Sequence, residues 1–172
     1  MFIPGKALFG AGVVAKVAEV VGEDIKRVFL VTDENLAKVG TAKRIEEILK
    51  SAGKDVMIFD SVEPEPSVET TDKAAFAARN FKAQAVIGLG GGSCMDVAKA
   101  VSALVTNEGS AAQYQGLGLV KKPGVLKVMI PTTAGTGSEV TFTAVLIRRS
   151  DGFKGGINDD KLFADYALLD PE

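Results

Sequence analysis

The sequence predicts an α/β protein with a doubly wound, mainly parallel β-sheet. Three observations predict this fold class. Apolar, β-branched runs alternate with segments of helical periodicity, polar loops follow two of the apolar runs, and a hairpin pattern occurs only near the C-terminus. Strands that alternate with helices at this spacing are joined by right-handed crossovers and therefore lie parallel.

Each element follows from its local pattern. Apolar residues three and four apart predict helices, with Thr41 as the N-cap of the second helix and Gly53 as the residue that ends it. The segment 142–159 is expected to form a hairpin that turns at residues 150–152. The expected strands are residues 2–10, 27–32, 55–60, 84–90, 125–131 and 165–170. The expected helices are residues 12–21, 41–53, 68–83 and 95–105.

Composition excludes several classes of protein. At 172 residues with 47% hydrophobic residues, one domain with one core is expected. The 20 basic and 22 acidic residues give a net charge of -2, which creates no field for nucleic acid or for an anionic membrane. No apolar run approaches the roughly 20 residues that span a bilayer. The single cysteine, Cys94, excludes an internal disulfide and fits a reducing compartment, so a cytoplasmic location is expected.

Histidine is absent from the sequence. Histidine is the commonest ligand of transition metals and the commonest general base, and one cysteine cannot replace it. We therefore expect that this chain alone builds no zinc or iron site from the usual ligands.

Four glycines lie between an apolar run and a helical run, at Gly88, Gly90, Gly91 and Gly92. Ligands of a parallel sheet bind beyond the carboxyl ends of its strands, where a glycine-rich turn into a helix offers free N–H groups to an anion. The spacing is not the dinucleotide fingerprint, because Ser93 stands where the third glycine belongs, and it is not a Walker A loop, because the next lysine, Lys99, lies inside the expected helix. Two interpretations stay open: a phosphate site, or a tight turn packed against a neighbour.

A second polar loop, PTTAGTGSEVT at residues 131–141, follows another expected strand and carries five hydroxyls. Two such loops after two parallel strands can flank one pyrophosphate; the alternative is an ordinary polar loop in which Ser138 caps a helix. Asp33 ends a strand, where a carboxylate can accept hydrogen bonds from a ribose diol and repel a 2′-phosphate. Its alternative role is the N-cap of the next helix.

The motifs GLGGGSCMDVAKA and IPTTAGTGSEVT, with LVTDENL upstream and LLDPE at the end, closely resemble the N-terminal domain of the iron-containing (group III) alcohol dehydrogenase family. The resemblance covers essentially the whole chain. It implies that residues 1–172 are a Rossmann-like domain that binds NAD(H), followed in the family by an all-helical domain that carries a catalytic divalent metal, iron or zinc. The implied chemistry is hydride transfer between a small alcohol or aldehyde and NAD.

The resemblance also implies roles for individual residues. Asp33 is expected at the adenosine ribose, the glycines and Ser93 at the pyrophosphate, and the threonines along the adenine and phosphate side. Lys154 would face the cofactor from the hairpin, and Asp96 and Lys99 would be the helix residues of the glycine motif. Family members often have Asn-Pro where this chain has Glu65-Pro66, so position 65 receives no role. The implied cofactor-binding residues are Asp33, Gly91, Gly92, Ser93, Asp96, Thr132, Thr133, Thr136 and Lys154.

The sequence departs from the family in its length. The family's metal-binding aspartate and histidines lie after the position of LLDPE, so Asp170 is not an expected ligand, and neither a catalytic residue nor a metal site is expected here. We therefore expect a truncated domain that lacks the helical metal-binding half, binds NAD(H), is inactive by itself, and self-associates or docks with a helical domain. Two alternatives stay open: a glycerol or polyol dehydrogenase of the same superfamily, and a non-catalytic nucleotide-binding module.

Overall fold

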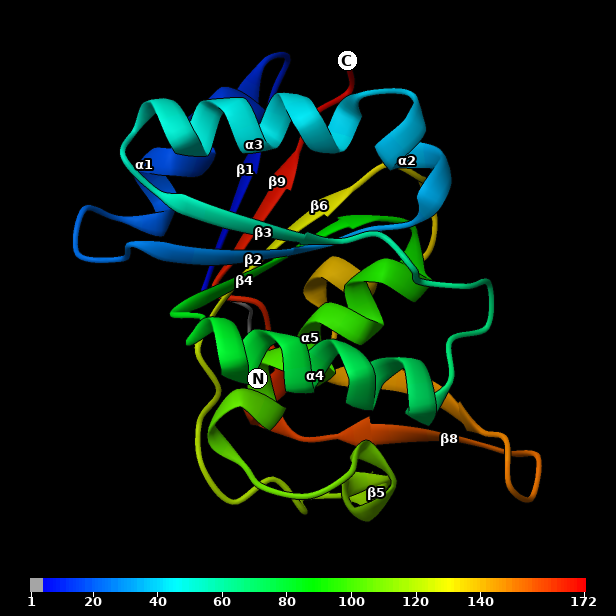
Figure 1. Ribbon diagram of the computed structural model, residues 1–172. Helices are drawn as coiled ribbons and strands as arrows, with labels where there is room; N and C mark the ends of the chain where they lie inside the picture. Colours follow the sequence, from blue (N-terminus) through cyan, green and yellow to red (C-terminus); the bar gives the residue numbers. More distant parts are fainter. Residues whose placement is uncertain (1–4) are drawn as a thin grey trace.

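The computed structural model describes residues 5–172, which form a large β-sheet with helices on both faces and a smaller β-sheet below it (Figure 1). The larger sheet has six strands in the order β1-β9-β6-β4-β2-β3, and every neighbouring pair is parallel. The chain passes from β2 outward to β3 and then returns to β4 on the other side of β2, which confirms the predicted doubly wound sheet. The six strands are β1 (Lys6–Phe9), β2 (Arg27–Val31), β3 (Asp55–Phe59), β4 (Ala85–Gly90), β6 (Leu126–Pro131) and β9 (Tyr166–Leu169).

Helices cover both faces of this sheet (Figure 1). Leu30 of β2 packs into the core that includes α3, whereas the preceding residue, Phe29, packs into the core that includes α4 and α5. A strand that is buried on both faces requires the nearly continuous apolar run from which it was predicted. Among residues 5–172, no helix is both long enough and apolar enough to cross a membrane. The helices on one face are α1 (Val17–Val21) and α3 (Thr41–Ser51), and those on the other are α4 (Val68–Phe81) and α5 (Gly92–Thr106).

The smaller sheet contains the predicted hairpin. Its strands β7 (Thr143–Arg148) and β8 (Phe153–Asn158) are antiparallel, and the two-residue strand β5 (Gly116–Leu117) pairs in parallel with β8. Leu146 of β7 is fully buried in the core that includes α5, so the hairpin packs below that helix, away from the large sheet (Figure 1). The hairpin prediction is confirmed, whereas β5 is not among the predicted strands.

Two helix predictions need correction at their starts. The segment 12–21 is a 3₁₀ helix, η1 (Val13–Lys16), followed by the short α1. Thr41 is not an N-cap: Gly40 holds that position with a φ of 89°, and Thr41 is the first residue inside α3. Gly53 ends this helical segment with a φ of 74°, as predicted. The left-handed conformation at these two glycines is one that other residues rarely adopt.

Other differences concern the loops after the strands. Helix α5 begins at Gly92, so the end of the glycine run forms the first helical turn. The helix α2 (Glu34–Lys38) was not predicted as an element. In η3 (Ser138–Val140) the N-cap position is held by Gly137, so the alternative interpretation of Ser138 as a cap is wrong. The remaining 3₁₀ helices are η2 (Ala111–Tyr114) and η4 (Asp160–Leu162).

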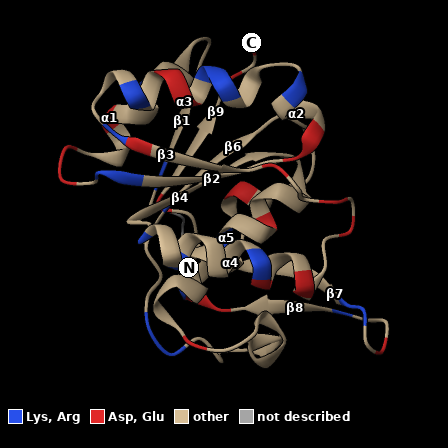
Figure 2. Cartoon of the chain, in the orientation of Figure 1, with Lys and Arg blue, Asp and Glu red and all other residues tan. Residues whose placement is uncertain are grey.

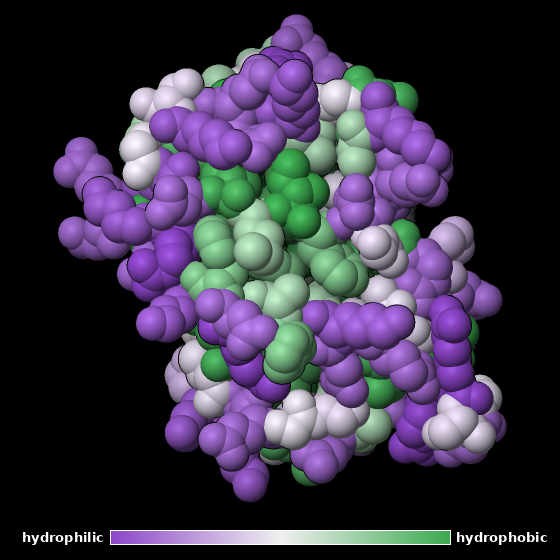
Figure 3. Space-filling view, in the orientation of Figure 1, coloured by the Kyte–Doolittle hydropathy of each residue, from purple (hydrophilic) through white to green (hydrophobic). Residues whose placement is uncertain are grey.

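Strand β3 forms one edge of the large sheet. Within the described part of the chain it pairs only with β2. Met57, in the middle of β3, is 38% exposed. Figure 3 shows an apolar band at this edge, between the polar surfaces of α3 and α4. An unpaired apolar edge of this kind favours association with another chain.

Candidate functional site

A cavity opens at the carboxyl ends of β2, β3, β4 and β6, which are neighbours in the large sheet. Its volume is about 820 Å³. In an open parallel sheet, ligands bind at this edge because the loops that follow the strands converge there. The cavity is lined by segments 33–36, 60–64, 91–94 and 132–133, one after each of the four strands.

The start of α5 forms one wall of this cavity. Gly91 is its N-cap in an extended conformation, no side chain caps the helix, and no acidic residue lies in the first turn of its 15 residues. The unpaired N–H groups and the dipole of such a helix end attract an anion. A Cβ on Gly91 would lie 3.3 Å from Thr133 Oγ1, and one on Gly92 would lie 3.5 Å from Thr136 Cβ. Residues 91–94, the glycine loop, therefore face residues 131–141, the threonine loop. The two glycines keep the space between these loops open.

The other two glycines of the run have a packing role. A Cβ on Gly88 would lie 2.8 Å from Ala98 Cβ, and one on Gly90 would lie 2.7 Å from Cys94 Sγ. Gly90 also has a φ of 142°. The packing interpretation therefore holds for these two residues, while Gly91 and Gly92 line the cavity.

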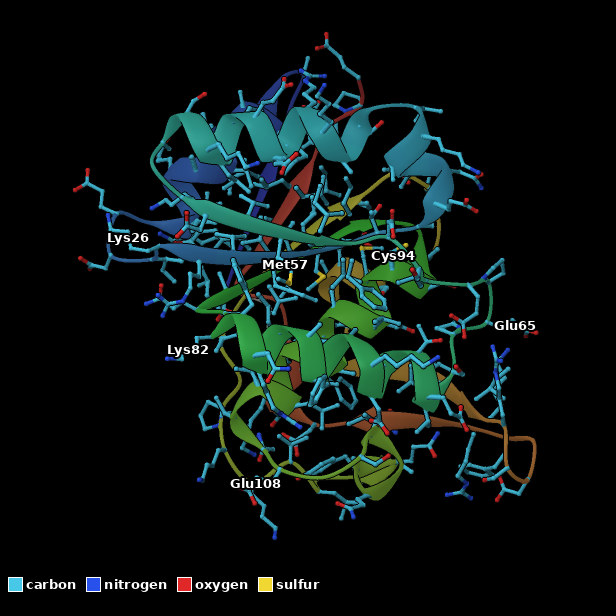
Figure 4. All side chains as sticks on the ribbon, in the orientation of Figure 1. Lys26, Met57, Glu65, Lys82, Cys94 and Glu108 are labelled. Carbon is cyan, nitrogen blue, oxygen red and sulfur yellow. The ribbon has the colours of Figure 1, made fainter. Side chains whose placement is uncertain are left out.

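Asp33 lines the cavity and also caps α2. Its Oδ1 accepts hydrogen bonds from the backbone N–H groups of Asn35 and Leu36, at 2.9 and 3.0 Å. The N-cap role, considered as an alternative for this residue, is therefore confirmed. Its Oδ2 accepts a hydrogen bond from Cys94 Sγ at 3.6 Å. Cys94 lies in the first turn of α5 (Figure 4). Burial, followed by the charge of Asp33 and this hydrogen bond, raises the pKa of the Cys94 thiol to about 12. Cys94 therefore stays protonated and neutral at pH 7.

The segment 60–64 forms a wall that the sequence did not predict. Glu63 in this segment accepts a hydrogen bond from Arg149 Nη2 at 3.0 Å and three local ones, all at Oε1: from Ser67 N at 3.1 Å, Ser67 Oγ at 2.7 Å and Thr70 Oγ1 at 2.9 Å. Burial alone would raise the pKa of the Glu63 carboxyl, but the local donors outweigh it and lower the pKa below the usual value. No local sequence pattern reveals this wall, because its place at the cavity depends on the position of β3 beside β2 in the sheet.

The charged residues that line the cavity are all acidic. They are Asp33, Glu34, Asp60 and Glu63. Their combined charge disfavours an additional phosphate on a ligand in this cavity, whereas the helix end at Gly92 favours anionic groups near itself.

Asp96 and Lys99 lie below the cavity and do not line it. Lys99 is fully buried, with Nζ 3.0 Å from Asp96 Oδ1 and 2.9 Å from the carbonyl oxygen of Ser138, to which it donates. Asp96 also accepts hydrogen bonds from Ser138 Oγ at 2.6 Å and from Val145 N at 3.0 Å. Burial lowers the pKa of Lys99, and the charge of Asp96 opposes this shift. The pair thus attaches the threonine loop and the hairpin to α5.

A second cavity of about 660 Å³ lies beside the first and shares Leu36, Thr132 and Thr133 with it. Its lining is mostly apolar, with the charged residues Arg44, Glu139, Asp170 and Glu172. Asp170 accepts hydrogen bonds from Gly12 N and Val14 N, both at 3.0 Å. The hydrogen bond from Val14 is the largest cause that lowers the pKa of Asp170, and the one from Gly12 lowers it further. The two bonds attach η1 to the residue that follows β9.

Comparison with known proteins assigns the family. The sequence model described as iron-containing alcohol dehydrogenase matches residues 4–171. The chain belongs to the iron-containing alcohol dehydrogenase family. It is 38% identical over 168 residues to a sulfoacetaldehyde reductase from Bilophila wadsworthia. This match covers 97% of the present chain and 43% of that reductase.

Solved structures of the iron-containing alcohol dehydrogenase family have the same fold. A 1,3-propanediol oxidoreductase matches with a TM-score of 0.94 and 32% identity, over 99% of this chain and 45% of its own. A sulfoacetaldehyde reductase from Bifidobacterium kashiwanohense, solved in complex with NAD⁺, matches with a TM-score of 0.91 and 32% identity over the same shares. The chain therefore spans less than half the length of these relatives, and its fold is Rossmann-like.

The cavity of this iron-containing alcohol dehydrogenase chain fits a dinucleotide. The evidence for this fit is the space at Gly91 and Gly92, which Cβ atoms on these residues would fill on the side that faces Thr133 and Thr136. The cavity brings together Asp33, Gly91, Gly92, Ser93, Thr132 and Thr133 from the predicted set. Thr136 lies against Gly92, whereas Lys154 lies on β8 and pairs with Glu65 at 2.7 Å. Within residues 5–172, no group of three or more His, Cys, Asp or Glu side chains could hold a metal ion.

Proposed function

We propose that residues 1–172 are the dinucleotide-binding domain of a metal-dependent alcohol dehydrogenase and bind NAD(H) in the larger cavity. One observation carries this proposal: the uncapped N-terminus of α5 opens onto a cavity at the carboxyl ends of neighbouring parallel strands. The pyrophosphate of NAD(H) lies at Gly91, Gly92 and Ser93, where it accepts hydrogen bonds from backbone N–H groups. The family membership supports the same ligand.

The remaining contacts orient the cofactor. Asp33 accepts hydrogen bonds from the adenosine ribose through oxygen lone pairs that the cap does not use. Thr132, Thr133 and Thr136 lie along the adenine and phosphate side. Direct contacts of Asp96 and Lys154 with the cofactor stay predictions, because neither residue lines the cavity.

The chemistry of the complete protein is hydride transfer between NAD and a small alcohol or aldehyde. When bound, the nicotinamide would supply or accept the hydride, and the divalent metal expected from the family, iron or zinc, would polarise the substrate oxygen. The residues of this chain bind the cofactor, fix its orientation and keep its phosphates at the helix end. We propose that the chain alone binds cofactor without turnover, because it contains no histidine. A glycerol or polyol substrate would use the same domain.

Two further properties belong to this proposal. The exposed apolar edge at β3, with Met57, supports self-association or docking of a helical domain. The single buried cysteine, unable to form an internal disulfide, supports a reducing, cytoplasmic compartment.

The test is a fluorescence titration of the chain with NADH and with NADPH. We expect at least about tenfold tighter binding of NADH, or ~1.4 kcal/mol, because Asp33 repels a 2′-phosphate. Asp33→Asn keeps an N-cap side chain for α2 and removes the charge, so it should narrow this preference. Equal affinity of the unmodified chain for both cofactors would contradict the role of Asp33, and no binding of either would contradict the proposed function.

A further inference from the structure

The wall formed by segment 60–64 is held from outside by the β7–β8 hairpin. Ile147 of β7 donates its backbone N–H to the carbonyl oxygen of Pro66 at 2.9 Å and forms an isolated parallel bridge with Ser67. Arg149, in the hairpin turn, makes an ion pair with Glu63 at 3.0 Å. Figure 2 shows the acidic segment between β3 and α4 above the charged turn of the hairpin. The hairpin therefore contacts this wall at several points.

A second ion pair joins the hairpin to Glu65, the residue that directly follows this wall. Lys154 of β8 donates to Glu65 Oε1 at 2.7 Å, and Figure 4 shows Glu65 on the outer side of the segment. Glu65 has a φ of 54°, which is unfavourable for a side chain that is not glycine, asparagine or aspartate. A strained residue of this kind persists where surrounding contacts hold it. The contact from Lys154 is one that holds the wall in its conformation.

The other side of the hairpin is attached to the opposite wall of the cavity. Val145 of β7 donates its backbone N–H to Asp96 of α5 at 3.0 Å, and Lys99 of α5 donates to the carbonyl oxygen of Thr143. Helix α5 opens onto the cavity at Gly92. The hairpin thus connects α5, whose start forms one wall of the cavity, with segment 60–64, which forms another.

Glu63 is the point at which this connection reaches the cavity. It lines the cavity, and its Oε1 accepts from Arg149 in addition to the donors from Ser67 and Thr70. Ser67 caps α4, so the position of Glu63 is tied both to the start of α4 and to the hairpin. Removing Arg149 leaves Glu63 with its local donors and removes its own ion pair with the hairpin, while the contact of Ile147 with Pro66 and the ion pair of Lys154 with Glu65 remain.

We propose that the β7–β8 hairpin is a brace that sets the distance between the two walls, and that Arg149 is a positioning residue that acts through Glu63 on dinucleotide affinity. The proposal rests on the proposed function, because the ligand is the same NAD(H). Arg149 itself does not line the cavity. Its side chain is 63% exposed, so the contribution of its ion pair is that of a surface pair.

The experiment compares Arg149→Ala, Arg149→Lys and a matched control, Arg148→Ala, by titration with NADH at low salt. Arg148→Ala removes an exposed ion pair with Asp151 from the same turn without touching segment 60–64. We expect Arg149→Ala to raise the Kd about two- to fivefold, the range for a surface ion pair, and Arg149→Lys to restore most of the affinity. High salt should abolish the difference between Arg149→Ala and the unmodified chain.

The rate of amide hydrogen exchange at residues 60–67, measured without ligand, reports how firmly the hairpin holds this segment. We expect faster exchange in Arg149→Ala than in the unmodified chain and in Arg148→Ala. Unchanged exchange in Arg149→Ala would overturn the role of Arg149 in positioning Glu63. Faster exchange with unchanged NADH affinity would overturn its link to binding, and failure of the unmodified chain to bind NADH would overturn the proposed function instead.

Discussion

Gly92→Val separates binding from folding at the start of α5. Gly92 is the first residue of the helix, and its φ lies outside the left-handed region, so a side chain meets no backbone strain there. An added Cβ would lie 3.5 Å from Thr136 Cβ and Cγ2, which is ordinary van der Waals contact. The free protein should therefore accept alanine, which also has a higher helix propensity than glycine.

The bound state has less room. The Cβ of residue 92 projects into the gap between the glycine and threonine loops, where the pyrophosphate is proposed to lie. The branched side chain of valine displaces the phosphate from at least one backbone N–H, and a hydrogen bond to a charged group contributes about 1.5–3 kcal/mol. We therefore expect NADH to bind at least about tenfold more weakly to Gly92→Val, with Gly92→Ala in between.

The assay is titration of NADH fluorescence, which is simple here because the chain contains no tryptophan. Circular dichroism and thermal unfolding serve as controls and should be unchanged. Native-like affinity of a folded Gly92→Val protein would refute the reasoning that Gly92 leaves room for the pyrophosphate.

Three further predictions concern stability and turnover. Lys99→Met should cost about 3 kcal/mol of unfolding free energy in urea, because it leaves the Asp96 carboxylate without its buried partner; a loss below about 1 kcal/mol would contradict this. Because the folded protein lowers the pKa of Glu63 below 4.5, its contribution to stability is complete above pH 4.5 and is lost as the pH falls through the lowered pKa. Glu63→Gln should remove this part of the acid dependence in thermal unfolding, and an unchanged pH profile would count against it. With iron or zinc added, the chain should form no NADH from a short alcohol; chelator-sensitive turnover would reveal a metal site, for example at Asp159 and Asp160.

The fold was predictable where the signal is local. The apolar run before Asp33 and the apolar run before the glycines predict strands because each is buried on both faces of the sheet. Helix α2 gave no such signal, since none of its five residues is buried. The 3₁₀ form of η1 depends on hydrogen bonds from Gly12 and Val14 to Asp170, which lies more than 150 residues away. No local pattern contains that contact.

The candidate site was predictable where its residues belong to one continuous stretch of sequence. The glycine and threonine loops are continuous motifs, and the resemblance to the family indicated Asp33. The wall at Glu63 depends on which strand lies beside β2, and the contact between Asp33 and Cys94 depends on the neighbouring position of β2 and β4. Sequence periodicity predicts strands, but it does not specify their order in the sheet.

The buried position of Cys94 has a practical consequence for spectroscopy. Its residue is 2% exposed, and its raised pKa of about 12 leaves almost no thiolate at pH 7. Maleimides and iodoacetamides react with thiolates, so they will leave Cys94 unmodified while the protein is folded. A cysteine introduced at an exposed position such as Ser150, in the hairpin turn, would then be the only site to take up a fluorophore or spin label. Motion of the hairpin can thus be followed with the native cysteine left in place.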